Sequence, residues 1–184
     1  MGDPAGRPYY EGEFPLSPES YEESLQAFLV SALYARVGEP GTLKGEGGTA
    51  HFELKKVLGG GSCAAEREFD YSLPSGRVVT HKADILVALP KGRRLTIDLK
   101  WASSDLDQLK ARAYDMLLMK KSLSSQLWGM MVYLRPGTGG VGADQAQEIC
   151  FPFDLFFACE HQDPQNPVIW VPILDRIEAE ITGM

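Results

Sequence analysis

The spacing of hydrophobic residues changes along the chain from helical to strand-like and back, and it predicts the main elements. Apolar side chains three and four positions apart predict a helix over residues 17–38, with Ser17 as its cap and Gly38 at its end. Alternating segments separated by turns that contain Pro or Gly predict a three-stranded antiparallel meander. The three predicted strands cover residues 65–73, 77–89 and 93–102.

The second half of the chain begins with a further helical pattern over residues 103–123. Residues 126–134 are almost continuously apolar, which is typical of a strand covered on both faces. We expect a loop over residues 135–147, which are rich in Gly. The remaining segments predict late strands within 148–159 and 168–174, followed by a terminal helix over 174–181.

This order of elements predicts an α/β fold, in which a mixed sheet of four to five strands is flanked by helices. The last core strand should run parallel to its neighbour, because a helix connects the two strands. We expect one domain over residues 1–184, with a core at about 17–134 and a C-terminal elaboration at 135–184.

Composition narrows the functional classes. The net charge of −7 argues against coating nucleic acid through bulk electrostatics, although residues 77–121 hold ten of the eighteen Lys and Arg against five acids. The sequence has no long apolar span and no signal-peptide layout, so we expect a cytoplasmic protein without a membrane partner. The three cysteines form no CxxC pair, which disfavours a zinc site.

Charged residues interrupt the third predicted strand. By alternation, Asp98 and Lys100 share one face, and the turn before this strand can bring Asp84 beside Asp98. Two close carboxylates repel each other unless a cation lies between them, and Mg²⁺, with Mn²⁺ as a substitute, fits such oxygen ligands. An ordinary surface ion pair on a half-exposed strand would give the same pattern.

The sequence around this strand resembles the PD-(D/E)XK nuclease superfamily. The resemblance rests on Asp84, thirteen intervening residues, the run Asp98-Leu99-Lys100, a helix directly afterwards and glutamates in the first helix. It implies a restriction-endonuclease-like α-β-β-β-α-β core and Mg²⁺-dependent phosphodiester hydrolysis, with DNA as the expected substrate. One departure is Ala83, where the superfamily pattern has proline.

The resemblance also implies roles for individual residues. Asp84, Asp98 and the Leu99 carbonyl would bind the metal ion, and Lys100 would position or deprotonate the attacking water. Superfamily members often add a glutamate from the first helix. Here Glu22 is the better candidate because it lies closer to the apolar stripe than Glu23, and its alternative role is to stabilise the helix N-terminus.

Further candidates would contact the nucleic acid. These are Gln108, Arg112, Arg93 and Arg94, and for each of them a solvated surface position is the alternative interpretation. We expect His81 on the face opposite Asp84, because the two residues are an odd number of positions apart in a regular strand. The alternative to a nuclease is a catalytically inactive protein of the same fold, acting as a nucleic-acid-binding or protein-interaction subunit. Assembly as a homodimer or with a partner subunit stays open.

Overall fold

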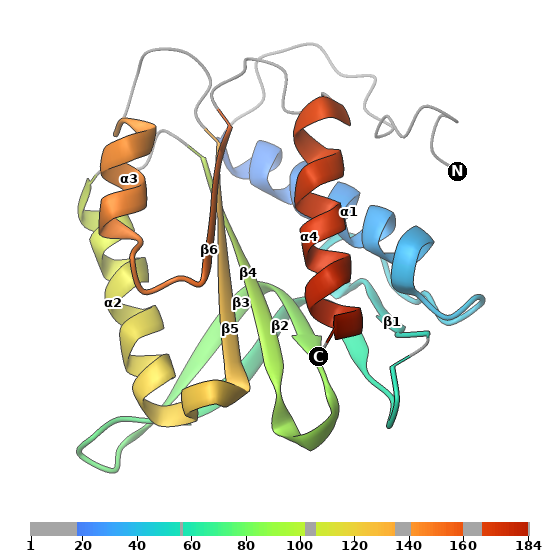
Figure 1. The fold of residues 1–184 in the computed structure, drawn as a ribbon, viewed down its shortest axis with the longest axis horizontal. Coiled ribbons are helices and arrows are strands. Elements are labelled where there is room, and N and C mark those ends of the chain that lie inside the picture. Colours follow the sequence, from blue (N-terminus) through green and yellow to red (C-terminus); the bar gives the residue numbers. More distant parts are fainter. Residues whose placement is uncertain (1–17, 56, 102–105, 135–140, 160–166, 184) are drawn as a thin grey trace.

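A six-stranded mixed sheet forms the centre of the protein in the computed structural model, which describes residues 18–55, 57–101, 106–134, 141–159 and 167–183 (Figure 1). The strands lie in the order in which they occur in the chain. They are β1 (His51–Glu53), β2 (Ser62–Ser72), β3 (Val78–Ala88), β4 (Arg94–Trp101), β5 (Leu127–Leu134) and β6 (Leu155–Cys159). Neighbours from β1 to β4 pair antiparallel, whereas β4, β5 and β6 are parallel.

Helices cover both faces of this sheet (Figure 1). On one face lie α1 (Pro18–Val37) and α4 (Pro167–Gly183), and on the other lie α2 (Leu106–Leu123) and α3 (Ala143–Ile149). The first pair encloses a core that includes Leu29, Ile97 and Trp170, which we call the α1–α4 core. The second pair encloses the α2–α3 core, which includes Met116, Tyr133 and Phe153.

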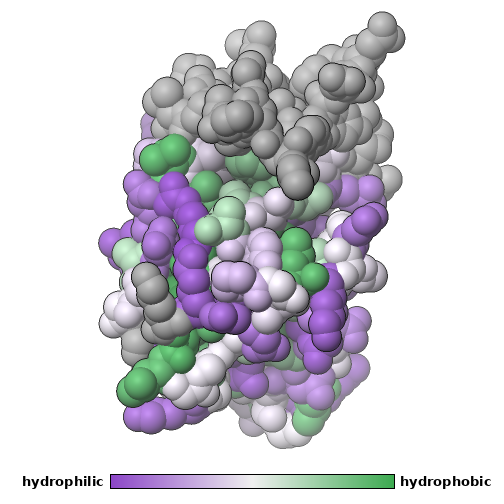
Figure 2. All heavy atoms as spheres, turned by 90° about the vertical axis from the view of Figure 1, so that its right-hand side faces the viewer, coloured by the Kyte–Doolittle hydropathy of each residue, from purple (hydrophilic) through white to green (hydrophobic). Residues whose placement is uncertain are grey.

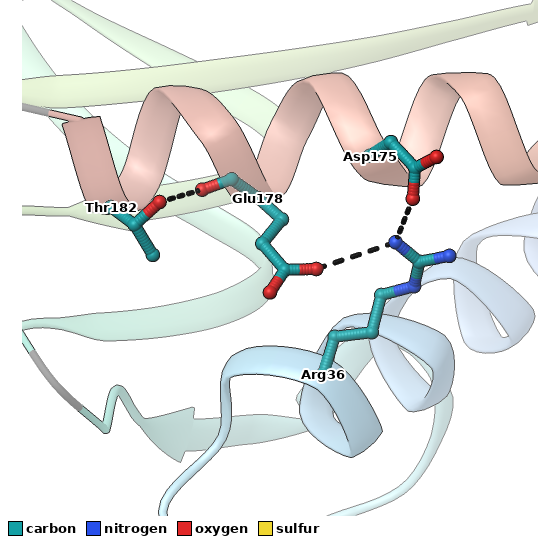
Figure 3. Close-up of polar contacts among 4 residues, drawn as sticks. All are labelled: Arg36, Asp175, Glu178 and Thr182. Atoms are coloured by element: carbon teal, nitrogen blue, oxygen red, sulfur yellow. Dashed lines mark hydrogen bonds and ion pairs between the residues drawn. The ribbon is translucent and has the colours of Figure 1, made fainter.

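Contacts between α1 and α4 join the two ends of the described chain. The rings of Phe28 and Trp170 meet edge to face, with centroids 5.8 Å apart. At the far end of α1, Nη1 of Arg36 lies 2.5 Å from Oδ1 of Asp175 and 3.3 Å from Oε2 of Glu178 (Figure 3). The C-terminal helix is therefore an integral part of the α1–α4 core.

On the opposite face, Asp154 connects α2 to the sheet. Its Oδ1 lies 2.6 Å from Nζ of Lys120, and its Oδ2 accepts a hydrogen bond of 2.9 Å from the backbone N–H of Gly129. Gly129 in turn lies against Met116, so that a Cβ at this position would come within 2.5 Å of the Met116 Cε. The parallel strands β5 and β6 are thus fixed beneath α2 by one carboxylate and one close helix–strand contact.

The α/β class and the flanking helices agree with the prediction from the sequence. The meander is confirmed as β2, β3 and β4, and β5 pairs parallel with β4 as the crossover rule requires. The sheet has six strands where four to five were expected. One edge strand, β6, lies within the predicted late strand at 148–159, and β1 extends the sheet at its other edge.

Two predictions in the C-terminal part were wrong. Residues 168–174 were expected to form a strand but belong to α4, where buried side chains recur three and four positions apart through Trp170, Ile173, Leu174, Ile177 and Ile181. The predicted loop over 135–147 contains the start of α3, which begins at Ala143. Residues 135–140 of that loop lie outside the described part of the chain.

The face of the molecule at the right of Figure 1 carries both polar and apolar residues. Figure 2 shows hydrophilic and hydrophobic residues interspersed over the described part of this face. Large apolar side chains such as Leu58 and Val171 are exposed at separate places on the described chain. None of the helices in the described ranges combines the length and apolar character needed to cross a membrane.

Candidate functional site at the bend of β3

A bend in the β2–β3 hairpin shapes the candidate site. Ala65 pairs with Ile85 and Arg67 with Ala83, but the pairing is interrupted between them. At the interruption Glu66 has a φ of +47°, a left-handed conformation that non-glycine residues rarely adopt. Its carboxylate forms an ion pair with the ammonium group of Lys82. The opposite residue on β3 is Asp84.

The parts of the hairpin before and beyond the bend face different cores. Before it, Ala65 and Ile85 lie in the α1–α4 core. Beyond it, Phe69 and Ala83 lie in the α2–α3 core, although regular alternation would keep Ala65 and Phe69 on one face. The outer part of the hairpin therefore packs on the side of the sheet that carries α2.

The carboxylate of Asp84 lies at the point where β3 separates from β4. The pairing of these strands stops at Ile85 and Ile97, so Asp84 and Asp98 are the next two residues beyond the ladder. The backbone N–H of Leu99 donates a hydrogen bond of 2.7 Å to Oδ2 of Asp84. This bond holds the Asp84 carboxylate next to the peptide group that joins Asp98 to Leu99.

Asp98 points to the α2–α3 side of the sheet and is buried. Its neighbours Ile97 and Leu99 belong to the α1–α4 core, as strand alternation requires. The Asp98 side chain is only 3% exposed, so the alternative of a solvated surface ion pair fails for this residue. Burial, and next the negative charge of Asp98, raise the pKa of the buried Cys150 thiol to about 11.

His81 faces Asp98 from the bent part of β3. Its Nε2 lies 3.8 Å from Oδ1 of Asp98, which is too long for a hydrogen bond. Neither atom is accessible to solvent, and neither has a hydrogen-bond partner among the described residues. The His81 ring also meets Phe69 edge to face at 5.5 Å, and this contact fixes its orientation.

The first helix approaches the same bend. The side-chain amide of Gln26, which is 4% exposed, donates a hydrogen bond of 2.5 Å to the backbone carbonyl of Asp84. Glu22 lies one turn earlier in α1, and its side chain is outside the described residues. The N-terminal half of α1 is therefore adjacent to β3 where Asp84 lies.

The remaining predicted residues are distributed around this centre. Lys100 is partly buried and lies two residues beyond Asp98, on the last part of β4. On α2, Gln108 is exposed and Arg112 is partly buried. Lys100 thus lies on β4, and the other two residues lie on α2, the next helix along the chain.

The basic residues of the β3–β4 turn lie at the opposite end of β4. Arg93 follows the 3-10 turn η2 (Pro90–Gly92), and Arg94 is the first residue of β4. The guanidinium carbon of Arg94 lies 5.4 Å from the centre of the Phe69 ring, and Nη1 donates to the Gly92 carbonyl at 3.4 Å. The backbone of Arg94 is four residues from Asp98 along an extended strand, but the Phe69 ring that its guanidinium group contacts also packs against His81.

Two residues near the site, His81 and Gln26, were missed by the sequence prediction. His81 was excluded by strand alternation, which fails because the bend at Glu66 and Asp84 exchanges the faces. Gln26 lies one turn after Glu22, and a polar residue among buried Leu25, Leu29 and Val30 was a signal that could have revealed it.

The described side chains provide only part of a metal site. Within the described ranges, no three His, Cys, Asp or Glu side chains are grouped closely enough to hold an ion. An ion at Asp98 would therefore need further ligands besides the described side chains, such as a main-chain oxygen, Glu22 or water. The buried Asp98 Oδ1, which has no hydrogen-bond partner in the described part of the chain, is an oxygen that such an ion would satisfy.

No protein-family model, no curated protein and no solved structure matches this chain.

Proposed function

We propose that this protein is a metal-dependent nuclease that hydrolyses phosphodiester bonds, with DNA as the expected substrate. One observation carries the proposal: the hydrogen bond from Leu99 N–H to Asp84 Oδ2, at 2.7 Å, keeps the Asp84 carboxylate beside the backbone of Asp98. Asp84 and Asp98 are thus the first residues beyond the end of the β3–β4 ladder. Lys100 follows on the same strand and would supply an ammonium group.

Each residue has a distinct role in this proposal. Asp84, Asp98 and the Leu99 carbonyl would hold the ion, and Glu22 would approach from α1. Mg²⁺, or Mn²⁺ in its place, would polarise the phosphoryl oxygen and lower the pKa of a bound water. Lys100 orients the attacking water and stabilises the negative charge that develops on the phosphate.

The buried position of Asp98 supports this assignment. A carboxylate that is removed from water is costly unless a cation or several hydrogen bonds compensate for it. Asp98 is 2% exposed, and Oδ1 has no hydrogen-bond partner within the described residues. A buried acidic group retained without full compensation is typical of a functional site.

The second candidate function is that of an inactive nuclease-fold subunit that binds nucleic acid or another protein. The same hydrogen bond favours this function, because Oδ2 of Asp84 already accepts the Leu99 N–H and is less available to bind an ion. The net charge of −7 also favours a role that does not depend on tight phosphate binding.

A cleavage assay tests the proposal. Single-stranded and double-stranded DNA and RNA are incubated with Mn²⁺ and the wild type, Asp98→Asn, Lys100→Ala or the control Lys121→Ala, which alters an exposed lysine of α2. We expect cleavage by the wild type and the control, and losses of about 100-fold or more in the two site variants. Cleavage that survives both site substitutions would contradict the proposal.

Failure of the wild type to cleave any substrate would favour the second candidate. Binding of the same nucleic acids, measured by fluorescence anisotropy, then distinguishes a binding subunit from a protein without a nucleic-acid ligand.

A further inference from the structure

His81 and Asp98 form a second pair of polar groups at the candidate site. The two side chains come from different strands, and they are 7% and 3% exposed. Buried polar atoms are normally hydrogen-bonded, yet His81 Nε2 and Asp98 Oδ1 face each other at 3.8 Å without a hydrogen-bond partner among the described residues. An ion bound between the two atoms would satisfy both of them.

The separation suits a metal ion. Donors about 2.1 Å from one ion stand about 3.4 Å apart at the tetrahedral angle and about 4.2 Å apart on opposite sides of it. The observed 3.8 Å lies between these limits. A hydrogen bond, in contrast, would need the two atoms to approach to about 2.9 Å.

The chemistry of the donors selects among ions. Mg²⁺ prefers oxygen ligands, whereas an imidazole nitrogen favours first-row transition metals such as cobalt or zinc. We infer that His81 binds a metal ion together with Asp98 and that the site prefers a transition-metal ion to Mg²⁺. This inference rests on the proposed function, because it assigns a further ligand to the ion that Asp98 would hold.

The local packing keeps His81 in position for this role. Phe69 contacts the imidazole ring edge to face, and the interrupted pairing at Glu66 and Asp84 turns His81 toward Asp98. A regular β3 would direct His81 to the other face of the sheet. The bend thus supplies a nitrogen donor that strand alternation alone would not place there.

Metal titration tests the inference without measuring cleavage. Co²⁺ and Mg²⁺ are titrated separately into the wild type, His81→Gln and His51→Ala by calorimetry, and the visible absorption of bound Co²⁺ is recorded. His51 is an exposed histidine on β1 and serves as the matched control. We expect His81→Gln to weaken Co²⁺ binding about tenfold or more and to shift its spectrum. Mg²⁺ affinity should change by less than about threefold, and His51→Ala should change neither ion.

The outcomes separate this inference from the proposed function. If His81→Gln binds Co²⁺ like the wild type with an unchanged spectrum, the inference is overturned. If Asp98→Asn nevertheless abolishes Mg²⁺ binding, the metal site of the proposed function stands. If the wild type binds neither ion, both fail, and a water molecule becomes the occupant between His81 and Asp98.

A second measurement needs no variant. Wild-type protein loaded with Mn²⁺ should show electron-spin-echo modulation from a directly bound nitrogen. Modulation from protons alone would overturn the inference, even if His81→Gln does not fold.

Discussion

Replacing Asp98 by asparagine is predicted to stabilise the metal-free protein and to abolish its stabilisation by metal. The Asp98 side chain is buried, and its Oδ1 has no hydrogen-bond partner within the described residues. Asparagine has nearly the same shape but carries no charge, so the cost of removing a carboxylate from water disappears. We expect the metal-free free energy of unfolding to rise by about 1–2 kcal/mol, because the nearby His81 offsets part of the original penalty.

Metal should reverse this order of stability. Mn²⁺ at a concentration of about 100 times its Kd adds about 2.7 kcal/mol to the free energy of unfolding of a protein that binds it only when folded. The wild type should gain this amount and the variant should not. Wild type in Mn²⁺ should therefore be more stable than Asp98→Asn by about 1 kcal/mol, the difference between the two effects.

Urea denaturation followed by tryptophan fluorescence measures both effects. With a slope of about 2 kcal/mol/M, the metal-free midpoint should rise by about 0.5–1 M in Asp98→Asn. Asp107→Asn is the control, because the Asp107 side chain is 90% exposed and should leave the midpoint nearly unchanged. The reasoning is refuted if Asp98→Asn lowers the metal-free midpoint and Mn²⁺ raises both proteins equally.

Three further predictions concern stability. Asp154→Ala should lower the free energy of unfolding by about 2 kcal/mol, because the buried Gly129 N–H loses its acceptor and Lys120 loses its ion-pair partner. Asp154→Asn should lower it by about half as much. Urea midpoints that do not separate the two variants would contradict this assignment. Gly129→Ala should cost about 1–3 kcal/mol, because its Cβ would come within 2.5 Å of the Met116 side chain, and an unchanged thermal midpoint would contradict the close contact. Burial raises the pKa of Cys63 from its ordinary value of 9.0 to about 12 in the folded protein. Above pH 9 the unfolded thiol releases its proton while the folded one retains it, so the stability that Cys63 contributes is lost as the pH rises through this window, by up to about 1.4 kcal/mol per pH unit. Stability curves of Cys63→Ala should fall less steeply between pH 9 and 11 than those of the wild type, and parallel curves would show that this thiol titrates normally.

Much of the fold follows from short-range patterns in the sequence. The alternation of Leu95, Ile97 and Leu99 with polar residues gave the faces of β4, and all three residues lie in the α1–α4 core. Helical spacing likewise located α1. The prediction for residues 168–174 was wrong because a short apolar run rich in Val and Ile has no clear hydrophobic periodicity. Only the packing of this segment against α1 distinguishes a helix from a strand here.

The bend of β3 could not be predicted from local sequence. Nothing in the residue type of Glu66 favours a φ of +47°, because glutamate is not among the residues that readily adopt left-handed backbone. The bend instead results from packing the outer hairpin against the α2–α3 core. The turn length predicted that Asp84 lies near Asp98 in the chain's fold, and both residues lie just beyond the β3–β4 ladder. The approach of His81 instead depended on this tertiary feature.

We propose that Asp84 and Asp98 hold a divalent ion at the end of the β3–β4 ladder. The most direct test of this proposal is an anomalous difference map from a crystal soaked in Mn²⁺. The account predicts a peak bound by the carboxylates of Asp84 and Asp98. An ordered site in which the two carboxylates point apart, with no peak beside either one, would contradict it.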